Sequence, residues 1–358
     1  MNSFYLLNLK NSNNLLKLIL SPEFLNIKNE AKLMKKMPDN NRLSYRGLLV
    51  IEFVTIVIAF VAFSLVLNYN ESFYMPDTIL FNVFLIITEF GDILIYMLLI
   101  SCFYYAYDKR IGKRLALCLL LSGYLIEFFK NIYQDPRPQN IETVDWDSYG
   151  FPSGHSSGSA AFYGYIGYSL KDKLKYSIIP ILMSLIIMLI ALSRVIIGVH
   201  DLQDIAGGLI LGIGFLLAYI HLHPILNEKY VELDLTNRLL IALLVPTLLF
   251  IIGSLVFPFG DFAYVCGFLV GVSVGFILEN EKVNYEPSEI DTKYRIINLV
   301  IGLVILSVLY YLIGELTELV NYFLFEFLMY SILGFVFGCV SPLIFTKINK
   351  TSKDIHRV

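Results

Sequence analysis

The chain alternates between long apolar runs and short polar linkers. A helix needs about 20 mainly apolar residues to cross the hydrocarbon core of a membrane, and the pattern predicts ten such helices. Their expected ranges are 47–67, 90–107, 113–131, 155–170, 176–193, 204–222, 239–257, 262–279, 296–314 and 321–345. The stretch 77–89 is also apolar, but Asp77, Asn82 and Glu89 interrupt it. There we expect a short helix lying in the membrane interface.

The composition supports a membrane protein. Hydrophobic residues make up 57% of the 358 residues and charged residues only 16%, whereas soluble chains carry about 25% charged residues. A soluble enzyme and a disordered chain are therefore excluded. The net charge of −3 provides no basic field for nucleic acid. We predict an all-α integral membrane protein in a lipid bilayer, without a nucleic-acid partner, and the oligomeric state stays open.

The positions of lysine and arginine predict the orientation, because these residues are retained on the cytoplasmic side. With ten spans and both termini inside, all but three of the 27 basic residues fall at cytoplasmic ends. The expected regions are a cytoplasmic arm (1–46), a six-span core (47–222), a cytoplasmic loop (223–238), a four-span region (239–345) and a cytoplasmic tail (346–358).

The three exceptions are Lys130, Arg137 and Arg194, all at outer ends of predicted spans. A single such residue can anchor a helix end by snorkelling, but three together favour a site. His155 begins the fourth span at the same side. His200 precedes Asp204 by four residues at the start of the sixth span, a spacing that puts both on one face of a helix.

These groups suit a phosphate ligand. Three cations offset its charge, and the two arginines can bind its oxygens with two hydrogen bonds each. Ser153 and Gly154 stand where a span begins, so free backbone N–H groups at a positive helix end would face the anion. Carboxylates suited to Mg²⁺ are not gathered among these residues, and the four cysteines lack metal-ligand spacing. We expect no metal and no cofactor.

Three sequence blocks carry a resemblance. They are Lys130 to Arg137-Pro138, Pro152-Ser153-Gly154-His155, and Ser193-Arg194 with His200 and Asp204. In order and spacing they resemble the signature of the type 2 phosphatidic acid phosphatase superfamily, in its membrane lipid-phosphate phosphatase branch. The resemblance covers roughly 47–222 and leaves the last four spans outside it.

The resemblance implies a role for each residue. His200 is the expected nucleophile, forming a phosphohistidine, with Asp204 holding its other ring nitrogen. His155 is the expected acid for the departing lipid oxygen and later the base for water. The phosphoryl oxygens would be bound by Lys130, Arg137, Ser153, Gly154 and Arg194.

The implied activity is metal-independent hydrolysis of a lipid phosphate or diphosphate at the extracytoplasmic face of the cell membrane, or the lumenal face of an internal one. Candidate substrates are polyprenyl phosphate or diphosphate, phosphatidic acid and similar lipids. Alternatives are a lipid phosphotransferase using an alcohol acceptor, and a non-catalytic lipid-phosphate transporter. The intact set of His200, Asp204 and His155 argues against the transporter. The related vanadium haloperoxidases are soluble and do not fit ten spans.

Other features have structural interpretations. Glycines occur at four-residue spacing, as Gly208 with Gly212 and as the series Gly267, Gly271 and Gly275. They predict close helix packing within the chain, with dimerisation as the alternative. Glu127 lies one helical turn before Lys130 and is expected to orient it. The last four spans are expected to shape a lipid-entry groove, mediate assembly or add a transport step.

Overall fold

The computed structural model describes residues 74, 76, 78–138, 149–171, 173, 178–257, 260–320 and 322–355, and the regular structure in these ranges is entirely helical. The α-helices are α4 (Ile79–Glu89), α5 (Ile93–Ser101), α6 (Lys109–Tyr133), α7 (Gly154–Leu170), α8 (Ile178–Ile196), α9 (Leu202–Val231), α10 (Leu235–Val256), α11 (Phe262–Leu278), α12 (Thr292–Val320), α13 (Phe323–Phe335) and α14 (Ser341–Ile355). The π-helical segments are η1 (Cys102–Tyr107), η3 (Glu279–Val283) and η5 (Val336–Val340), and η4 (Pro287–Glu289) is a 3₁₀ turn. The predicted all-α class is confirmed.

Seven helices in the described ranges are long and apolar enough to cross a membrane. They are 109–133, 178–196, 202–231, 235–256, 262–283, 292–320 and 323–349, and each coincides with a predicted span. The predicted span 90–107 falls on α5 and η1, which pair with α4 across a 46° bend to make an eighth candidate. The predicted span 47–67 lies outside the described residues.

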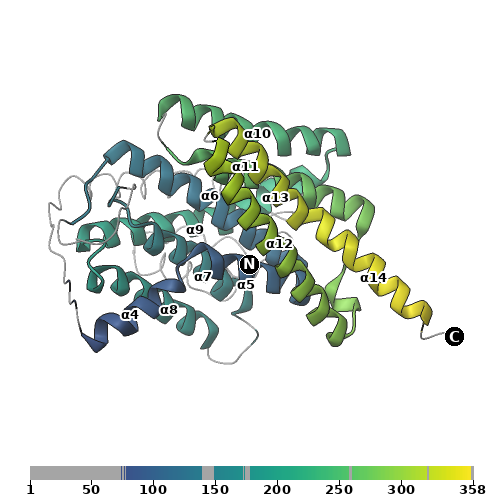
Figure 1. Ribbon diagram of the computed structural model, residues 1–358, viewed down its shortest axis with the longest axis horizontal. Helices are drawn as coiled ribbons and strands as arrows, with labels where there is room; N and C mark the ends of the chain where they lie inside the picture. The colour runs from purple at the N-terminus through teal and green to yellow at the C-terminus, as the bar shows by residue number, and fades with distance from the viewer. Residues whose placement is uncertain are drawn as a thin grey trace, which may run out of the picture. The chain divides into compact units, whose positions relative to one another are not determined.

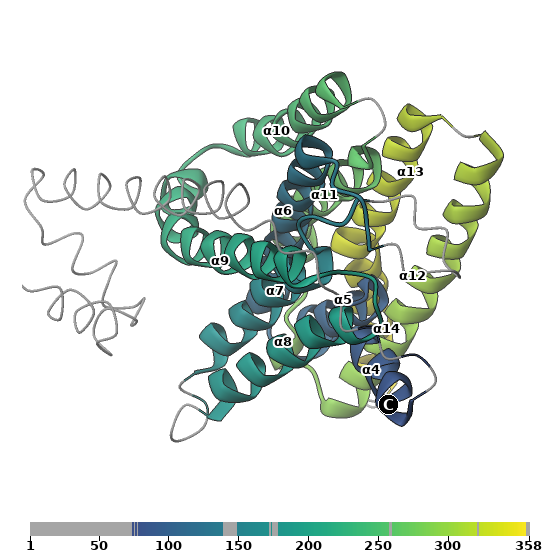
Figure 2. The same ribbon diagram turned by 90° about the vertical axis from the view of Figure 1, so that its left-hand side faces the viewer.

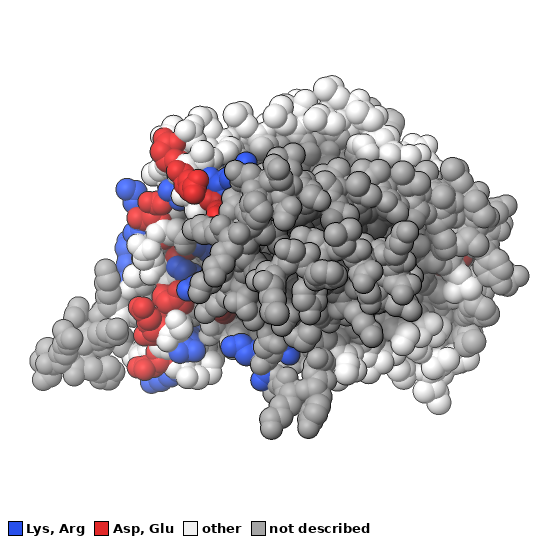
Figure 3. All heavy atoms as spheres, turned by 180° about the vertical axis from the view of Figure 1, so that it is seen from behind, with Lys and Arg blue, Asp and Glu red and all other residues white. Residues whose placement is uncertain are grey.

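The surface agrees with a multi-pass membrane protein. Large apolar side chains are exposed along several helices, as Leu255 (77%) on α10 and Leu319 (81%) on α12 illustrate. In Figure 3 the acidic and basic side chains that are coloured gather toward one edge, and most of the remaining described surface carries neither charge. A water-facing surface would distribute charge more evenly, so lipid is the solvent that these helices suit.

Helix α7 differs from the seven candidate membrane-spanning helices because other helices surround it. It has 17 residues, many of them glycine and serine, and most of its side chains are buried. It packs against α6, α8 and α9 (Figures 1 and 2). The predicted span 155–170 is therefore a helix, but it contacts mainly other helices. Its side chains need not be as apolar as those of a lipid-exposed helix.

Aspartate side chains cap the N-termini of several helices. Their carboxylates accept hydrogen bonds from backbone N–H groups of the first turn, which have no partner within the helix. Asp108 caps α6, Asp201 caps α9 and Asp234 caps α10. Helix α9 then continues to Val231, so the predicted loop 223–238 contains the last turns of this helix, and α10 begins at Leu235.

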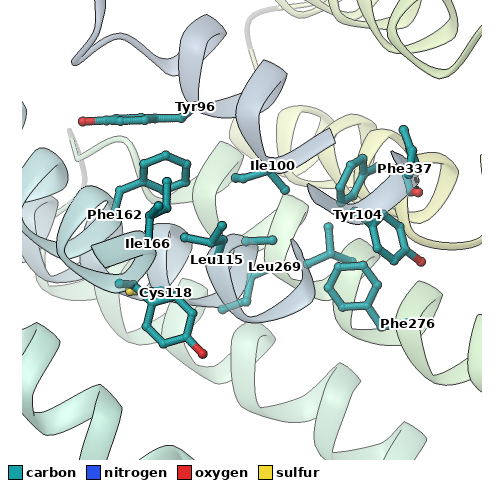
Figure 4. Packing of buried hydrophobic residues seen from close by; sticks show 14 of the residues in the cluster. Tyr96, Ile100, Tyr104, Leu115, Cys118, Phe162, Ile166, Leu269, Phe276 and Phe337 are labelled. Carbon is teal, nitrogen blue, oxygen red and sulfur yellow. Dashed lines mark hydrogen bonds between the residues drawn. The ribbon is translucent and has the colours of Figure 1, made fainter. Parts of the chain in front are cut away.

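The main apolar core joins the first described helices to the C-terminal ones (Figure 4). Tyr104, from η1, has no exposed surface, and its ring centroid lies 5.1 Å from those of Phe276 and Phe337. Its hydroxyl donates to the carbonyl of Gly338 at 2.6 Å. Both aromatic packing and a buried hydrogen bond therefore fix η1 against the C-terminal helices.

The predicted glycine contacts are confirmed. A Cβ on Gly271 would lie 2.1 Å from the carbonyl oxygen of Ser331, so α11 and α13 approach with their backbones nearly touching. A Cβ on Gly212 would lie 2.4 Å from the carbonyl oxygen of Ser157, which brings α9 equally close to α7. Small residues permit this approach in membrane helices.

A buried acid ties the start of α6 to the end of α11. The side chain of Glu279 has no exposed surface, and its two oxygens lie 3.2 Å from Nζ of Lys109 and 2.6 Å from Nζ of Lys113. The backbone N–H of Tyr285 also donates to it at 2.8 Å. This cluster satisfies the carboxylate fully, and it is part of one compact unit with the remaining described helices.

Candidate active site

The residues expected to form a site lie where α6 and α8 end and where α7 and α9 begin. Lys130 is in the last turn of α6, and Arg137 follows that helix. His155 is in the first turn of α7, and Arg194 is in the last turn of α8. We call this region the site end of the bundle.

A sharp turn between α8 and α9 holds His200. Gly198 adopts a φ of +81°, which glycine tolerates without strain. The backbone N–H groups of Val199 and His200 both donate to the carbonyl of Arg194, at 3.1 and 3.2 Å. Nδ1 of His200 lies 2.9 Å from Oδ2 of Asp204, and both side chains are almost fully buried. With Nδ1 held by the carboxylate, Nε2 is the ring nitrogen left for chemistry.

The start of α9 holds Asp204 in turn. The N–H of Asp204 donates to Oδ1 of Asp201 at 2.9 Å, and the N–H of Asp201 donates to Oδ2 of Asp204 at 3.3 Å. This reciprocal capping box fixes the carboxylate that orients His200. Asp201 was not among the predicted residues, although its place three residues before Asp204 is the spacing of such a box.

The two arginines are turned into the site. Nη1 of Arg137 lies 3.4 Å from Nε2 of His200 and donates to the carbonyl of Val199 at 3.1 Å. Arg194 is only 2% exposed and Lys130 8%. Burying cations is costly unless an opposite charge or hydrogen bonds compensate. A site with three of them suits an anion.

Helix α4 and the turn after it contribute one residue each that the sequence pattern did not reveal. Oγ1 of Thr88 accepts a hydrogen bond from Nη1 of Arg194 at 2.7 Å. Gly91 follows α4, and a Cβ there would lie 2.7 Å from Cδ2 of His155. The stretch 77–89 was expected to lie apart in the interface, but its end reaches the site. A threonine and a glycine in an apolar run give little sign of such a role.

The start of α7 corrects one expectation. Ser153 caps the helix, with its Oγ accepting from the N–H of Ser156 at 3.4 Å. Its own N–H donates to the carbonyl of Asp204 at 3.0 Å, so it is not one of the free groups expected to meet an anion. Gly154 does have open space, because a Cβ there would meet only Cγ2 of Ile126, at 3.6 Å.

The charges of the site act on both histidines. Arg194, Lys130 and Arg137 lie close enough for their charges to affect the imidazoles of His155 and His200. Burial, followed by these three charges, holds the pKa of His200 well below its ordinary value of 6.5. The ring is therefore neutral at neutral pH, the form in which Nε2 has a free electron pair.

Glu127 was expected to orient Lys130. Its Oε1 accepts hydrogen bonds from Nδ2 of Asn131 at 2.6 Å and from the N–H of Asp261 at 3.1 Å. Asp261 stands at the start of α11. Glu127 therefore joins α6 to the C-terminal helices beside the site.

Acids and thiols suited to a metal are not clustered in the part of the chain that the structure describes. There, no group of three or more His, Cys, Asp and Glu side chains could hold an ion. The four cysteines are free thiols, three buried and Cys102 half-buried. Metal independence stays a prediction to be tested by activity.

Comparison with known families gives two adjacent matches. Residues 112–228 match the PAP2 superfamily, and residues 263–353 match the transmembrane extension of PAP2 superfamily phosphatases. The first match contains every site residue that the sequence predicted, but not Thr88 or Gly91. The second contains α12 and α13 and nearly all of α11 and α14. The last three predicted spans therefore have a known counterpart, whereas α10 lies outside both matches.

Several curated proteins are similar to the chain. Phosphatidylglycerophosphatase B of Bacillus subtilis is 34% identical over 26% of this chain and 47% of its own length. Lipid phosphate phosphatase delta of Arabidopsis thaliana is 27% identical over 33% of this chain and 32% of its own. Sphingosine-1-phosphate phosphatase 1 of Mus musculus is 25% identical over 55% and 48%. The chain thus spans about half or less of the length of these relatives.

One solved structure is also similar. It is the crystal structure of a transmembrane PAP2-type phosphatidylglycerolphosphate phosphatase from Bacillus subtilis, with 27% sequence identity. The match covers 52% of this chain and 96% of that one, with a TM-score of 0.36.

Proposed function

The chain belongs to the PAP2 superfamily, and from this we propose that it is a membrane phosphatase that hydrolyses a lipid phosphate or diphosphate through a phosphohistidine on His200. The reaction takes place at the extracytoplasmic face. The observation that carries the proposal is the arrangement around His200. Its Nδ1 is 2.9 Å from Asp204 and its Nε2 is 3.4 Å from the guanidinium of Arg137.

The first step forms one bond and breaks another. The electron pair on Nε2 of His200 attacks phosphorus, and the bond from phosphorus to the leaving oxygen breaks. That oxygen belongs to the lipid alcohol in a monophosphate and to the lipid phosphate in a diphosphate. His155, as the imidazolium, gives the leaving oxygen its proton. The proton on Nδ1 stays with the imidazole and is stabilised by Asp204, much as a carboxylate supports the histidine of a hydrolase triad.

The second step restores the enzyme. His155, now unprotonated, takes a proton from water as the water oxygen attacks phosphorus. The nitrogen–phosphorus bond breaks, inorganic phosphate leaves, and both imidazoles regain their starting states. Lys130, Arg137 and Arg194, with the N–H groups at the start of α7, stabilise the charge on the phosphoryl oxygens throughout.

The surroundings of the site and the names of the relatives support the proposed substrate class. The relatives' names refer to phosphatidylglycerophosphate, lipid phosphates and sphingosine-1-phosphate. A phosphate site at the end of a bundle of lipid-exposed helices suits such molecules, because their chains stay in apolar surroundings while the phosphate meets the cations.

The test is phosphate release by the purified protein in lipid nanodiscs. The panel is a polyprenyl phosphate and diphosphate, phosphatidic acid, phosphatidylglycerophosphate and a sphingoid phosphate, each with and without EDTA. We expect release from at least one lipid, unaffected by EDTA, and loss of release in His200→Ala. His221→Ala is the matched control, since His221 lies in the second half of α9, away from the site end. No release from any lipid, or undiminished release by His200→Ala, would refute the proposal.

A further inference from the structure

A cavity of about 480 Å³ adjoins the candidate site. Lys130 and Gly154 from the site line it, together with Gly91, which stands against the ring of His155. The cavity therefore reaches the edge of the site beside Lys130, one of the residues proposed to bind the phosphate.

From the site the cavity runs along one face of α6. The lining residues of this helix are Ala116, Leu119, Leu120, Gly123, Ile126, Glu127 and Lys130. Their spacing of three and four residues describes a single helical stripe. Since a helix rises about 1.5 Å per residue, the stripe from Ala116 to Lys130 is about 21 Å long.

The remaining lining residues come mainly from α5 and from the C-terminal extension. From the extension, Val265 and Phe268 of α11, Leu306 of α12 and Leu333 of α13 line the cavity. These side chains are apolar, whereas the charged lining residues Lys130, Glu127 and Asp261 stand at or next to the site end. The cavity is thus long, apolar over most of its length and charged at the end where the site lies.

We propose that this cavity holds the hydrocarbon chain of the substrate, so that the C-terminal extension takes part in selecting which lipid phosphates are hydrolysed. This inference rests on the proposed function and identifies the kind of substrate. The length and volume of the cavity suit part or all of one hydrocarbon chain.

Gly123 offers a clean test. It lies seven residues before Lys130, about 10 Å along the helix. A Cβ there would meet only Cγ2 of Val265, at 4.0 Å, so a side chain can enter the cavity without displacing its neighbours. Gly123→Leu should therefore block the deeper part of the cavity and leave the phosphate end unchanged.

The matched control is Gly314→Leu. Gly314 is also a glycine within a long helix, α12, and a Cβ there would meet nothing within 4 Å. It does not line the cavity. Both substitutions replace glycine with a better helix former, so they should affect helix stability similarly.

The measurement is kcat/KM for n-alkyl phosphates from butyl to dodecyl, in nanodiscs, for the wild type and both variants. The ratio of variant to wild type at each chain length cancels the partitioning of the substrate into the membrane. For Gly123→Leu we expect a ratio near one with butyl phosphate and a fall of at least tenfold by dodecyl phosphate. For Gly314→Leu the ratio should stay near one at every length.

A ratio for Gly123→Leu that does not change with chain length would overturn the inference. If Gly123→Leu loses activity even on butyl phosphate, Gly123→Ala, which adds one methyl group, gives the same test with a smaller expected slope. Hydrolysis of nitrophenyl phosphate by the wild type separates the two claims. If it is cleaved and the chain-length ratio is flat, only the chain inference fails; if neither nitrophenyl phosphate nor any lipid or alkyl phosphate is cleaved, the proposed function fails as well.

Discussion

The two nitrogens of His200 have different surroundings, and this difference has consequences for catalysis. Nδ1 is held by a buried carboxylate, while Nε2 faces the guanidinium of Arg137. Without substrate, the guanidinium and the other two cations disfavour protonation of the ring. When a phosphoryl group is bound, its negatively charged oxygens offset the charge of these cations, and the neutral Nε2 is next to phosphorus.

The pH dependence of activity should reflect this. Since the pKa of His200 is lowered below 6.5, the neutral ring survives as the pH falls through 6.5, and activity is lost only at the lowered pKa. The acidic limb of kcat/KM should therefore lie below pH 6.5. In Arg137→Gln, one charge that lowers the pKa is gone, so the limb should move to higher pH while the substrate's own ionisation stays the same. An unchanged limb in this variant would contradict the assignment.

The roles of the two histidines can be separated by the leaving group. A lipid alkoxide must be protonated to leave, so His155→Ala should lose about 10²–10⁴-fold on a lipid phosphate. Nitrophenolate is stable as an anion, so a burst of nitrophenol should persist in His155→Ala. His200→Ala should show no burst with nitrophenyl phosphate and no release of phosphate from a lipid phosphate. The reverse pattern would exchange the roles, and equal losses would leave His155 as a phosphate-binding residue.

Helix ends, more than helix interiors, build this site. Lys130 and Arg194 lie in last turns, while His155 and Asp204 lie in first turns. Capping therefore affects function as well as stability wherever the capped end belongs to the site.

Two aspartate caps allow this to be measured. Asp201 caps α9 at the site, and Asp234 caps α10 away from it. Each Asp→Ala should cost about 1 kcal/mol of stability, seen as a similar fall in melting temperature. Only Asp201→Ala should also lower kcat, because it releases the carboxylate that holds His200. Equal kcat in the two variants would show that the capping box does not matter for catalysis.

The sequence predicted the helices better than the contacts between them. Long apolar runs revealed seven spans directly, and the paired motifs predicted that the site residues would meet, because alternating helices bring those ends together. Thr88 and Gly91 were missed, since hydropathy reports how apolar a segment is and says nothing of which neighbour it touches. For the same reason the pattern gave no sign that Glu127 bonds to the start of α11.

At the scale of the molecule, the orientation can be tested directly. The position of nearly all basic residues predicts that a cysteine placed in 139–149 reacts with an impermeant thiol reagent on intact cells. Ser288→Cys, at an exposed position beyond the other end of α11, should not react. The unsubstituted chain, with three buried cysteines and one half-buried, provides the background. Labelling of Ser288→Cys would contradict the predicted topology.

The joint between α6 and the extension should dominate stability. Removing one partner of a buried ion pair costs about 3–5 kcal/mol, and Glu279→Gln should be near the lower value, because the two lysines keep some exposure. Glu281→Gln is the matched control. Glu281 pairs with Arg238 at 2.8 Å but is partly exposed, so its loss should cost no more than about 1 kcal/mol. Comparable melting temperatures would show that the cluster is not a stabilising joint.

The partners in the Glu279 cluster are synthesised at different times. Lys113 and Glu279 are 166 residues apart in the chain, and a ribosome adds about 5–20 residues per second. Lys113 is therefore made roughly 8–33 seconds before its carboxylate partner exists. During that interval the two lysines have no Glu279 to pair with, and long side chains at a helix end can reach water instead. The buried state of this cluster therefore forms only after α11 has been made.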